Sequence, residues 1–448
     1  MATRDATALD VSVIVRSMAR PTLDAALASA ASQHGVTAEV LVVAACGPGH
    51  PPLPSACGPH VLRLVTGTGR LPRAAAANVG LDAARGRWIT FLDDDDVFLP
   101  DHLAGLLAAA EHDPKVRVVT SYAKSVFRDG HVEWFGQPFS LTQLYERNFI
   151  HLSSTLFARE LVLAGCRFDE DLEILEDWEF MLQLAQRARF RFVPLGSFQW
   201  HADAGDSGAA GGANHDDAKF ASHRERIYAR WAPARDALVE RTAPLLERAA
   251  GLARSGNLAG ADVLCREVLE ISANDPWALQ LRAMLLRQAG RPADARGVQT
   301  LATAVRPQDA SFVYNLALLD RACGDLDAAR RELLALSAAV ALAGCGKGRD
   351  AGECTGDDRD DPHHRHASFP RRHALGLRDA RCACIFSHIG SNPPCWNPRS
   401  GEGRTLRPRR TRIPRRAHPL AARQPHAEDE HRLPQHPPRR RHLQQYGP

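Results

Sequence analysis

The chain has 448 residues, 44% of them hydrophobic and 24% charged, which is enough for two or three soluble domains with sizeable cores. Its net charge of +4 is uneven: residues 341–448 carry 21 Lys and Arg against 11 Asp and Glu, so the rest is mildly acidic. This acidity argues against nucleic-acid binding, and no stretch approaches the roughly 20 apolar residues of a membrane span. Because no apolar signal region opens the chain, we expect a cytoplasmic protein, or one bound peripherally at the inner membrane face.

The first 100 residues predict alternating strands and helices. Short apolar strands are expected at residues 11–15, 39–44, 61–65 and 88–92, separated by helices or loops. This order favours an α/β fold with a mostly parallel sheet and helices on its faces. Ligands of such sheets bind beyond the carboxyl ends of the strands, and four consecutive aspartates follow the fourth strand directly.

Residues 102–200 give a mixed pattern. Strands are expected at residues 116–127 and 189–195, and helices at residues 141–148, 154–165 and 176–188. A Gly/Ala-rich loop at residues 202–217 follows, and we expect it to act as a mobile lid over a site. We therefore assign residues 1–220 to one α/β domain.

Residues 221–343 read as a second, all-helical domain. Gly256, Gly290 and Gly324 recur at the 34-residue period of a tetratricopeptide unit. Pro276 precedes the next helix after the first unit, but Pro307 comes three residues early, so that turn is expected to be irregular. Tetratricopeptide-like helix pairs are the main hypothesis, and an unrelated helical hairpin is the alternative. Such an array would dock a protein partner or hold an acceptor.

Residues 344–448 lose all periodicity and are rich in Arg, His and Pro. Such a composition buries too little apolar area to offset chain entropy, so we expect a disordered tail. A GC-rich gene read out of frame would produce such a tail. A metal site is a weaker reading because the Cys and His spacings fit no common zinc pattern, and so is nucleic-acid contact through the Arg runs.

The four aspartates at residues 93–96 need something to neutralise them, because adjacent carboxylates repel each other and are partly desolvated at a sheet edge. A solvated turn is the ordinary explanation for such a charge run. Here the apolar stretches ITFL and VFLP bracket the run, which favours a buried turn and a hard divalent cation.

Four sequence features make the first 200 residues resemble a family 2 glycosyltransferase of the GT-A fold. They are VSVIVRSMAR, RAAAANVGLDAARGRWITFLDDDD, LEDWEF and the pair WH at residues 200–201. The resemblance implies that Asp93 and Asp95 form an Asp-x-Asp motif for Mn²⁺ or Mg²⁺ and for the diphosphate of a nucleotide-sugar donor. Asp95 is then the direct metal ligand, Asp93 faces the ribose or the metal, and Asp94 and Asp96 are weaker candidates.

The same resemblance implies a catalytic base in a Glu-Asp pair. Asp177 is the candidate base and Glu176 its support, because inverting transfer needs a group to take the proton of the acceptor hydroxyl. The ordinary reading of such a pair at a helix start is capping, and the two roles are compatible.

Further donor and metal contacts are carried over from the family in the same way. Ser17 is expected at the nucleoside, Arg73 and Asn78 at the nucleotide or diphosphate, and His201 at the metal. One departure stands out: the family usually ends its second strand in an Asp that contacts the nucleotide base, and this chain has Ala44 there.

The sequence thus predicts an inverting, metal-dependent glycosyltransferase that moves a sugar to a saccharide, lipid-linked or protein acceptor in bacterial polysaccharide or protein glycosylation. A degenerate transferase that serves as a tetratricopeptide scaffold is the alternative, and the clustered carboxylates count against it. A nucleotidyltransferase should carry a glycine-rich phosphate loop after the first strand, and RSMARPTLD has no glycine there.

Overall fold

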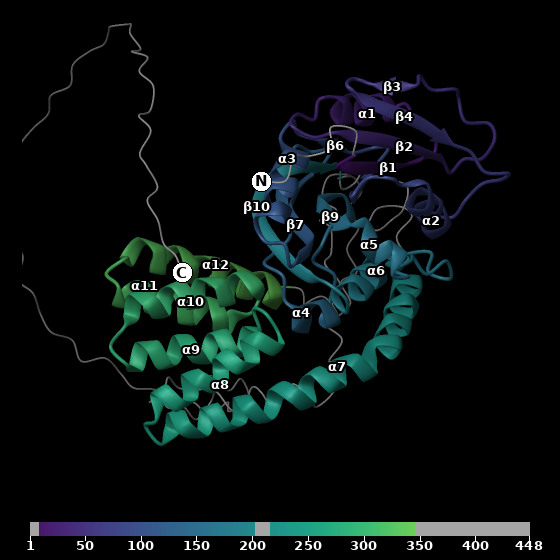
Figure 1. Cartoon of the computed structure of the whole chain (residues 1–448). Helices are drawn as coiled ribbons and strands as arrows, with labels where there is room; N and C mark the ends of the chain where they lie inside the picture. Colours follow the sequence, from purple (N-terminus) through teal and green to yellow (C-terminus); the bar gives the residue numbers. More distant parts are fainter. Residues whose placement is uncertain (1–8, 202–215, 346–448) are drawn as a thin grey trace, which may run out of the picture. The chain divides into compact units, whose positions relative to one another are not determined.

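The computed structural model describes residues 9–201 and 216–345 (Figure 1). Up to residue 201 they form one ten-stranded sheet in the order β3-β4-β2-β1-β5-β9-β7-β10-β6, with β8 paired to β7. The strands are β1 (Val11–Ser17), β2 (Ala38–Ala44), β3 (Ala56–Cys57), β4 (His60–Val65), β5 (Trp88–Asp93), β6 (Val97–Phe98), β7 (Val116–Val126), β8 (Val132–Phe135), β9 (Thr155–Ala158) and β10 (Arg189–His201). The helices of this part are α1 (Leu23–Ala31), α2 (Arg73–Ala83), α3 (His102–His112), α4 (Leu141–Glu146), η1 (Leu152–Ser154), α5 (Arg159–Leu163) and α6 (Glu176–Ala185).

The four strands expected from the apolar runs are confirmed as a parallel core. β4, β2, β1 and β5 pair in parallel in this order. All residues of β1 and β2 are buried, because helices cover both faces of the sheet. Parallel strands in one sheet have their carboxyl ends at the same edge, so the ends of β1 and β5 lie side by side.

The other half of the sheet is mixed rather than parallel. β9 lies antiparallel between β5 and β7, and β10 runs parallel to β7. The helix predicted over residues 154–165 is therefore wrong in its first third, where β9 forms, and only α5 is helical. Periodicity alone cannot separate a short buried strand from a helix turn when the residues are Thr, Leu and Phe.

Two apolar layers fill the faces of the sheet. Ile14 and Phe91 belong to the layer under α2 and α6, whereas Val13 and Val15 belong to the layer under α1 and α3. The Ala-rich α2 approaches β1 so closely that a Cβ on Gly80 would lie 2.3 Å from the Ile14 side chain. This close packing sets the position of Arg73, the first residue of α2.

The remaining elements are all helices, and their ends keep a 34-residue period. They are α7 (Asp217–Arg254), α8 (Leu258–Ile271), α9 (Pro276–Gln288), α10 (Pro292–Val305), α11 (Ala310–Ala322) and α12 (Leu326–Cys345). Gly256, Gly290 and Gly324 follow every second helix, α7, α9 and α11, with φ of 84°, 74° and 84°, as glycines do after helix C-caps. Asp275 and Asp309 cap α9 and α11 at the same 34-residue step, which Pro276 and Pro307 do not keep. The tetratricopeptide assignment itself stays a prediction.

We expect Gly290→Ala to destabilise the protein by about 1 kcal/mol, because a Cβ at positive φ is strained. Gly297→Ala is the matched control: Gly297 lies inside α10, and a Cβ there meets nothing within 4 Å. That substitution should stabilise the helix by about 0.5–1 kcal/mol. Urea unfolding of both variants measures the difference, and equal effects of the two substitutions would contradict the role given to the repeat glycines.

Three predictions meet the limits of the described chain. The expected lid at residues 202–217 lies outside it except for its last two residues, and the expected tail lies outside it except for residues 344–345, which end α12. The expected boundary at residues 220/221 falls in the first turn of α7. Across residues 9–201 and 216–345, no helix has the length and apolar character that crossing a bilayer requires.

Candidate active site

The aspartate run lies where the sequence predicts it, at the carboxyl edge of the parallel core. Asp93 is the last residue of β5, and its partner in the register of β1 is Arg16. The chain then turns, and β6 pairs with β10 so that His201, at the end of β10, comes beside the aspartates. Strand order therefore assembles this site from three segments distant in sequence.

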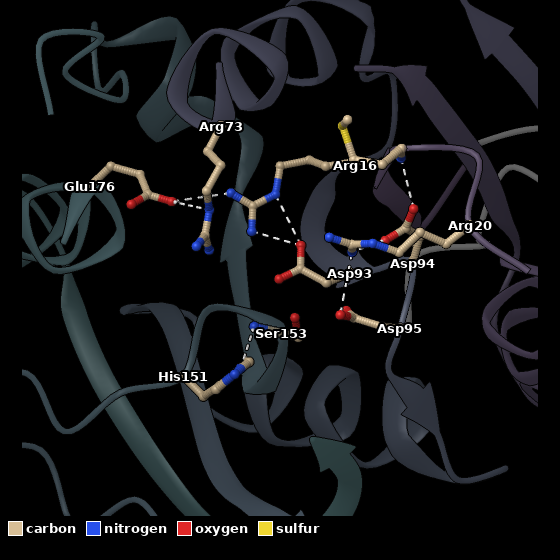
Figure 2. Close-up of polar contacts among 10 residues, drawn as sticks. Arg16, Arg20, Arg73, Asp93, Asp94, Asp95, His151, Ser153 and Glu176 are labelled. Atoms are coloured by element: carbon tan, nitrogen blue, oxygen red, sulfur yellow. Dashed lines mark hydrogen bonds and ion pairs between the residues drawn. The ribbon is translucent and has the colours of Figure 1, made fainter. Parts of the chain in front are cut away.

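Arg16 links the aspartates to α6, the helix that carries the predicted catalytic base Asp177 (Figure 2). Its guanidinium donates from Nε and Nη2 to Oδ1 of Asp93 at 3.0 and 2.6 Å, and from Nη1 to Oε1 of Glu176 at 3.3 Å. Arg73 reaches the same Glu176 oxygen at 3.1 Å. Burial alone would raise the pKa of Asp93, but Arg16 and Arg73 outweigh it and hold that pKa below its ordinary value.

Arg16→Met should lower the free energy of unfolding by about 3 kcal/mol near pH 7.5, because it removes an ion-pair partner of the buried Glu176 and of the partly buried Asp93. The loss should shrink as the pH falls and Asp93, whose pKa lies below its ordinary value in the folded protein, becomes protonated. Arg63→Met is the control, since Glu39 keeps hydrogen bonds from Ser12 and the Arg85 N–H. Urea unfolding compares the two variants, and an equal loss would contradict the linking role of Arg16.

The other aspartates of the run differ in how well they are compensated. Asp94 is buried and held from both sides, by the Met18 N–H at 2.7 Å and by Arg20 at 2.7 Å. Asp95 has a longer contact to Arg20, at 3.3 Å. Burial, and next the charge of Asp93, raise the pKa of Asp95 above its ordinary value. Burial, and next the charges of Asp93 and Asp95, raise the pKa of Asp96 well above its ordinary value. Asp95 and Asp96 are therefore less well compensated than Asp93 and Asp94 when ionised.

The donor set at this turn fits a hard divalent cation. Carboxylate oxygens are what Mn²⁺ and Mg²⁺ prefer, and a cation would offset the repulsion that raises the pKa of Asp95. Asp93 and Asp95 would hold it. Within the described ranges, no group of three His, Cys, Asp or Glu side chains is arranged to hold a metal ion.

His201 lies beside the run, as predicted. Its backbone N–H donates to Asp96 at 2.9 Å, and its Nδ1 lies 2.6 Å from the carbonyl oxygen of Asp95. Nδ1 must therefore carry the proton, which makes Nε2 the acceptor of the bond from the Gln199 amide at 3.1 Å. In this tautomer the Gln199 amide occupies the lone pair of Nε2, so metal binding by Nε2 would require that hydrogen bond to break. The metal role of His201 stays a prediction.

The Glu-Asp pair predicted to contain the catalytic base lies at the start of α6. Glu176 and Asp177 are its first two residues, and Leu175 before them has a φ of 62°. Glu176 is buried and ion-paired to Arg16 and Arg73, so it acts as a bridging anion. Burial, and next Glu176, raise the pKa of Asp177 to about 6, a value suited to a general base near neutral pH.

Two residues predicted to contact the nucleotide-sugar donor, Ser17 and Asn78, form hydrogen bonds within the protein. The Ser17 hydroxyl lies 2.9 Å from Nε2 of His50 and accepts the Ala19 N–H. The Asn78 amide bonds to the backbone of Phe168 in both directions and also to Glu170. Asn78 therefore connects α2 to the segment that contains Phe168 and Glu170. Contact of Ser17 and Asn78 with the nucleotide-sugar donor stays a prediction.

The sequence did not single out Arg16, Arg20, His151 or Ser153. Arg16 and Arg20 occur in the VSVIVRSMAR stretch, and basic residues after a strand could have suggested partners for an acidic strand end. Figure 2 shows His151 and Ser153 near Asp93 and Asp95. Burial lowers the pKa of His151 to about 4, so its imidazole is neutral at pH 7.

Residues 12–160 match the family described as Glycosyl transferase family 2. This segment is a family 2 glycosyltransferase domain. It covers β1 to β9 and the aspartate turn. The expected order of an α/β domain followed by a helical region is confirmed, but the sheet is mixed rather than mostly parallel.

Several curated proteins are similar to parts of the chain. The succinoglycan biosynthesis protein ExoO of Rhizobium meliloti is 29% identical over 219 residues, 45% of this chain and 63% of that protein. A PGL/p-HBAD biosynthesis glycosyltransferase of Mycobacterium bovis is 32% identical over 111 residues, 24% of this chain and 41% of that protein. The chain thus spans less than two thirds of these relatives.

Among solved structures, S. aureus TarS 1-349 in complex with UDP-GlcNAc aligns with 67% of this chain and 93% of that chain. The identity is 16% and the TM-score is 0.39.

Proposed function

We propose that the chain is an inverting, metal-dependent glycosyltransferase that uses a nucleotide-sugar donor. The observation that carries the proposal is the aspartate turn at the end of β5, where Asp95 is incompletely compensated, linked through Arg16 to the helix that bears Asp177. The family 2 match of residues 12–160 supports the reaction class, and the similarity to ExoO, a succinoglycan biosynthesis protein, supports a saccharide acceptor.

Asp93 and Asp95 would hold Mn²⁺ or Mg²⁺ together with the donor diphosphate. When bound, such a cation stabilises the negative charge that builds up on the departing diphosphate. Arg73 is 39% exposed and adds a positive charge at the same edge, beside Glu176. We assign Arg73 to the donor phosphates.

Asp177 would take the proton of the acceptor hydroxyl. The acceptor oxygen forms a bond to the anomeric carbon as the bond from that carbon to the diphosphate oxygen breaks, with the electron pair leaving on the diphosphate. Attack from the face opposite the leaving group inverts the anomeric configuration. A carboxylate with a pKa near 6 is ionised at pH 7.5 and is still basic enough to assist.

The helical array from α7 to α12 would present a partner or an acceptor to this site. Ala44 ends β2 in a buried position and offers no carboxylate to a nucleotide base. The identity of the nucleotide must therefore be found by experiment.

The test is nucleotide release from a panel of UDP-, GDP- and dTDP-sugars with and without Mn²⁺, followed by NMR of the product's anomeric proton. We expect release from one donor class, dependent on Mn²⁺, with the anomeric configuration inverted. Retention of configuration would refute the inverting assignment. Release that is the same in EDTA would refute the metal dependence.

A further inference from the structure

Asp177 receives one hydrogen bond on each carboxylate oxygen. Oδ1 accepts the Trp178 N–H at 2.7 Å, and Oδ2 accepts from Nδ2 of Asn148 at 3.2 Å. The first donor belongs to the same helix turn and moves with it. The second comes from a different segment, 29 residues earlier, so this hydrogen bond ties the carboxylate to another part of the fold.

The orientation of the Asn148 amide is fixed by its other end. Its Oδ1 accepts the Ile150 N–H at 3.0 Å, which requires the NH₂ group to point away from Ile150 and toward Asp177. A flipped amide would place an oxygen against the carboxylate and lose both bonds. Asn148 is half-buried and therefore acts as a directed donor to Asp177.

The chain just before Asn148 is anchored to α6 and α7. The buried Trp178 indole donates to the carbonyl of Leu144 at 2.8 Å, and the Tyr228 hydroxyl donates to the carbonyl of Glu146 at 2.6 Å. The Trp178 and Tyr228 rings also meet edge to face. The carbonyls of α4 are thus held at both its middle and its end.

The helical array holds the other side of α4. The Thr142 hydroxyl donates to Oδ2 of Asp275 at 2.9 Å, and Asp275 is the buried N-cap of α9. Asn274 donates to the carbonyl of Phe139 at 2.8 Å. Contacts of the repeats therefore reach the segment that carries Asn148.

We propose that Asn148 is a positioning residue for Asp177, and that the helical array holds Asn148 in place through α4. Asp177 is the base only under the proposed function, so this role depends on that function. The array would then contribute to turnover directly, in addition to any partner it binds.

The kinetic test uses Asn148→Ala, with nucleotide release measured from the nucleotide sugar that the wild type turns over. We expect kcat to fall about tenfold, as for loss of a hydrogen bond to a charged group, with KM for the donor unchanged. Asn257→Ala, which removes the side-chain cap of α8, is the matched control and should leave kcat unchanged. An unchanged kcat in Asn148→Ala would overturn the proposal.

A double variant separates positioning from general damage. In an Asp177→Asn background, Asn148→Ala should have no further effect on kcat, because no base remains to be positioned. A further tenfold loss there would overturn the positioning role. Thr142→Val tests the array: we expect kcat to fall about threefold in the wild-type background and not in the Asp177→Asn background. If Thr142→Val changes the melting temperature but not kcat, the proposal that the helical array holds Asn148 in place is overturned.

The melting temperatures of the same variants keep this test apart from the proposed function. If the wild type turns over no nucleotide sugar, the proposed function is refuted, and so is the assignment of Asp177 as the catalytic base. A double-mutant cycle of melting temperatures with Asn148→Ala and Asp177→Asn then still tests the hydrogen bond between the two side chains. Non-additive melting temperatures support the contact, and additive ones overturn it.

Discussion

Asp177→Asn is expected to lower kcat by about a thousandfold while the affinity for the nucleotide stays unchanged. The amide keeps the shape of the side chain, but it cannot take a proton from the acceptor hydroxyl. Nucleotide affinity should survive because Asp177 lies on α6, whereas the cation is assigned to Asp93 and Asp95 after β5. Nucleotide release under saturating donor measures kcat, and calorimetry measures affinity.

The wild-type pH profile gives the same residue a second test. Because the pKa of Asp177 is raised to about 6, the base is protonated below that pH. We expect kcat to fall as the pH drops through 6, and the residual rate of Asp177→Asn to lack this limb. Asp169→Asn, at a carboxylate that pairs with Arg226 and Arg230, is the control and should retain the wild-type profile. Asp177→Asn with near wild-type turnover would contradict the assignment of the base.

Asp95→Asn is expected to weaken Mn²⁺-dependent nucleotide binding by about a hundredfold or more and, at the same time, to raise the melting temperature of the metal-free protein. Burial and Asp93 raise the folded-state pKa of Asp95 above its unfolded value, so ionised Asp95 costs stability. That cost grows as the pH rises through the folded-state pKa, and a neutral amide removes it. A group that lowers stability but is needed for binding is expected at a functional site.

Asp94→Asn is the comparison that makes this test specific. Asp94 already has the Met18 N–H and Arg20 as partners, so a neutral side chain there weakens an existing ion pair. We expect Asp94→Asn to lower the melting temperature and Asp95→Asn to raise it. Thermal unfolding in EDTA measures both, and a decrease in both would contradict the unequal compensation of the two carboxylates.

The sequence could predict the features that consecutive residues encode. The parallel core was predictable because strands buried on both faces read as unbroken apolar stretches, and the aspartate turn because it ends such a stretch. Asp93, Asp95, Arg73, Glu176 and His201 come from four segments and lie at one edge. Carboxyl-end geometry indicated the aspartates, whereas the other three were expected from the family resemblance alone.

The partners of those residues could not be predicted because they depend on strand order. Arg16 pairs with Asp93 only because β1 lies directly beside β5, 77 residues away in the chain. From the sequence alone, a cation was expected to neutralise the aspartates, whereas Arg16 and Arg20 provide part of the neutralisation. Asn148 was missed for the same reason, since nothing in the sequence around it points to Asp177.

The helical array shows a different limit. The 34-residue step of Gly256, Gly290 and Gly324 was visible, and the structure gives all three a positive φ. The early Pro307 suggested an irregular turn, but the cap at Asp309 keeps the step from Asp275. A hydrogen-bonding cap fixes the start of a helix, and Pro307 lies two residues before the cap of α11, outside the helix.

The most direct test of the central claim is a calorimetric titration of the full chain with UDP, GDP and dTDP, each with and without Mn²⁺. The protein must first be shown to be folded by circular dichroism. We predict that one nucleotide binds, that binding requires Mn²⁺, and that Asp95→Asn loses it. If no nucleotide binds to the folded protein under any condition, the glycosyltransferase account is contradicted, and a scaffold built on a transferase fold would replace it.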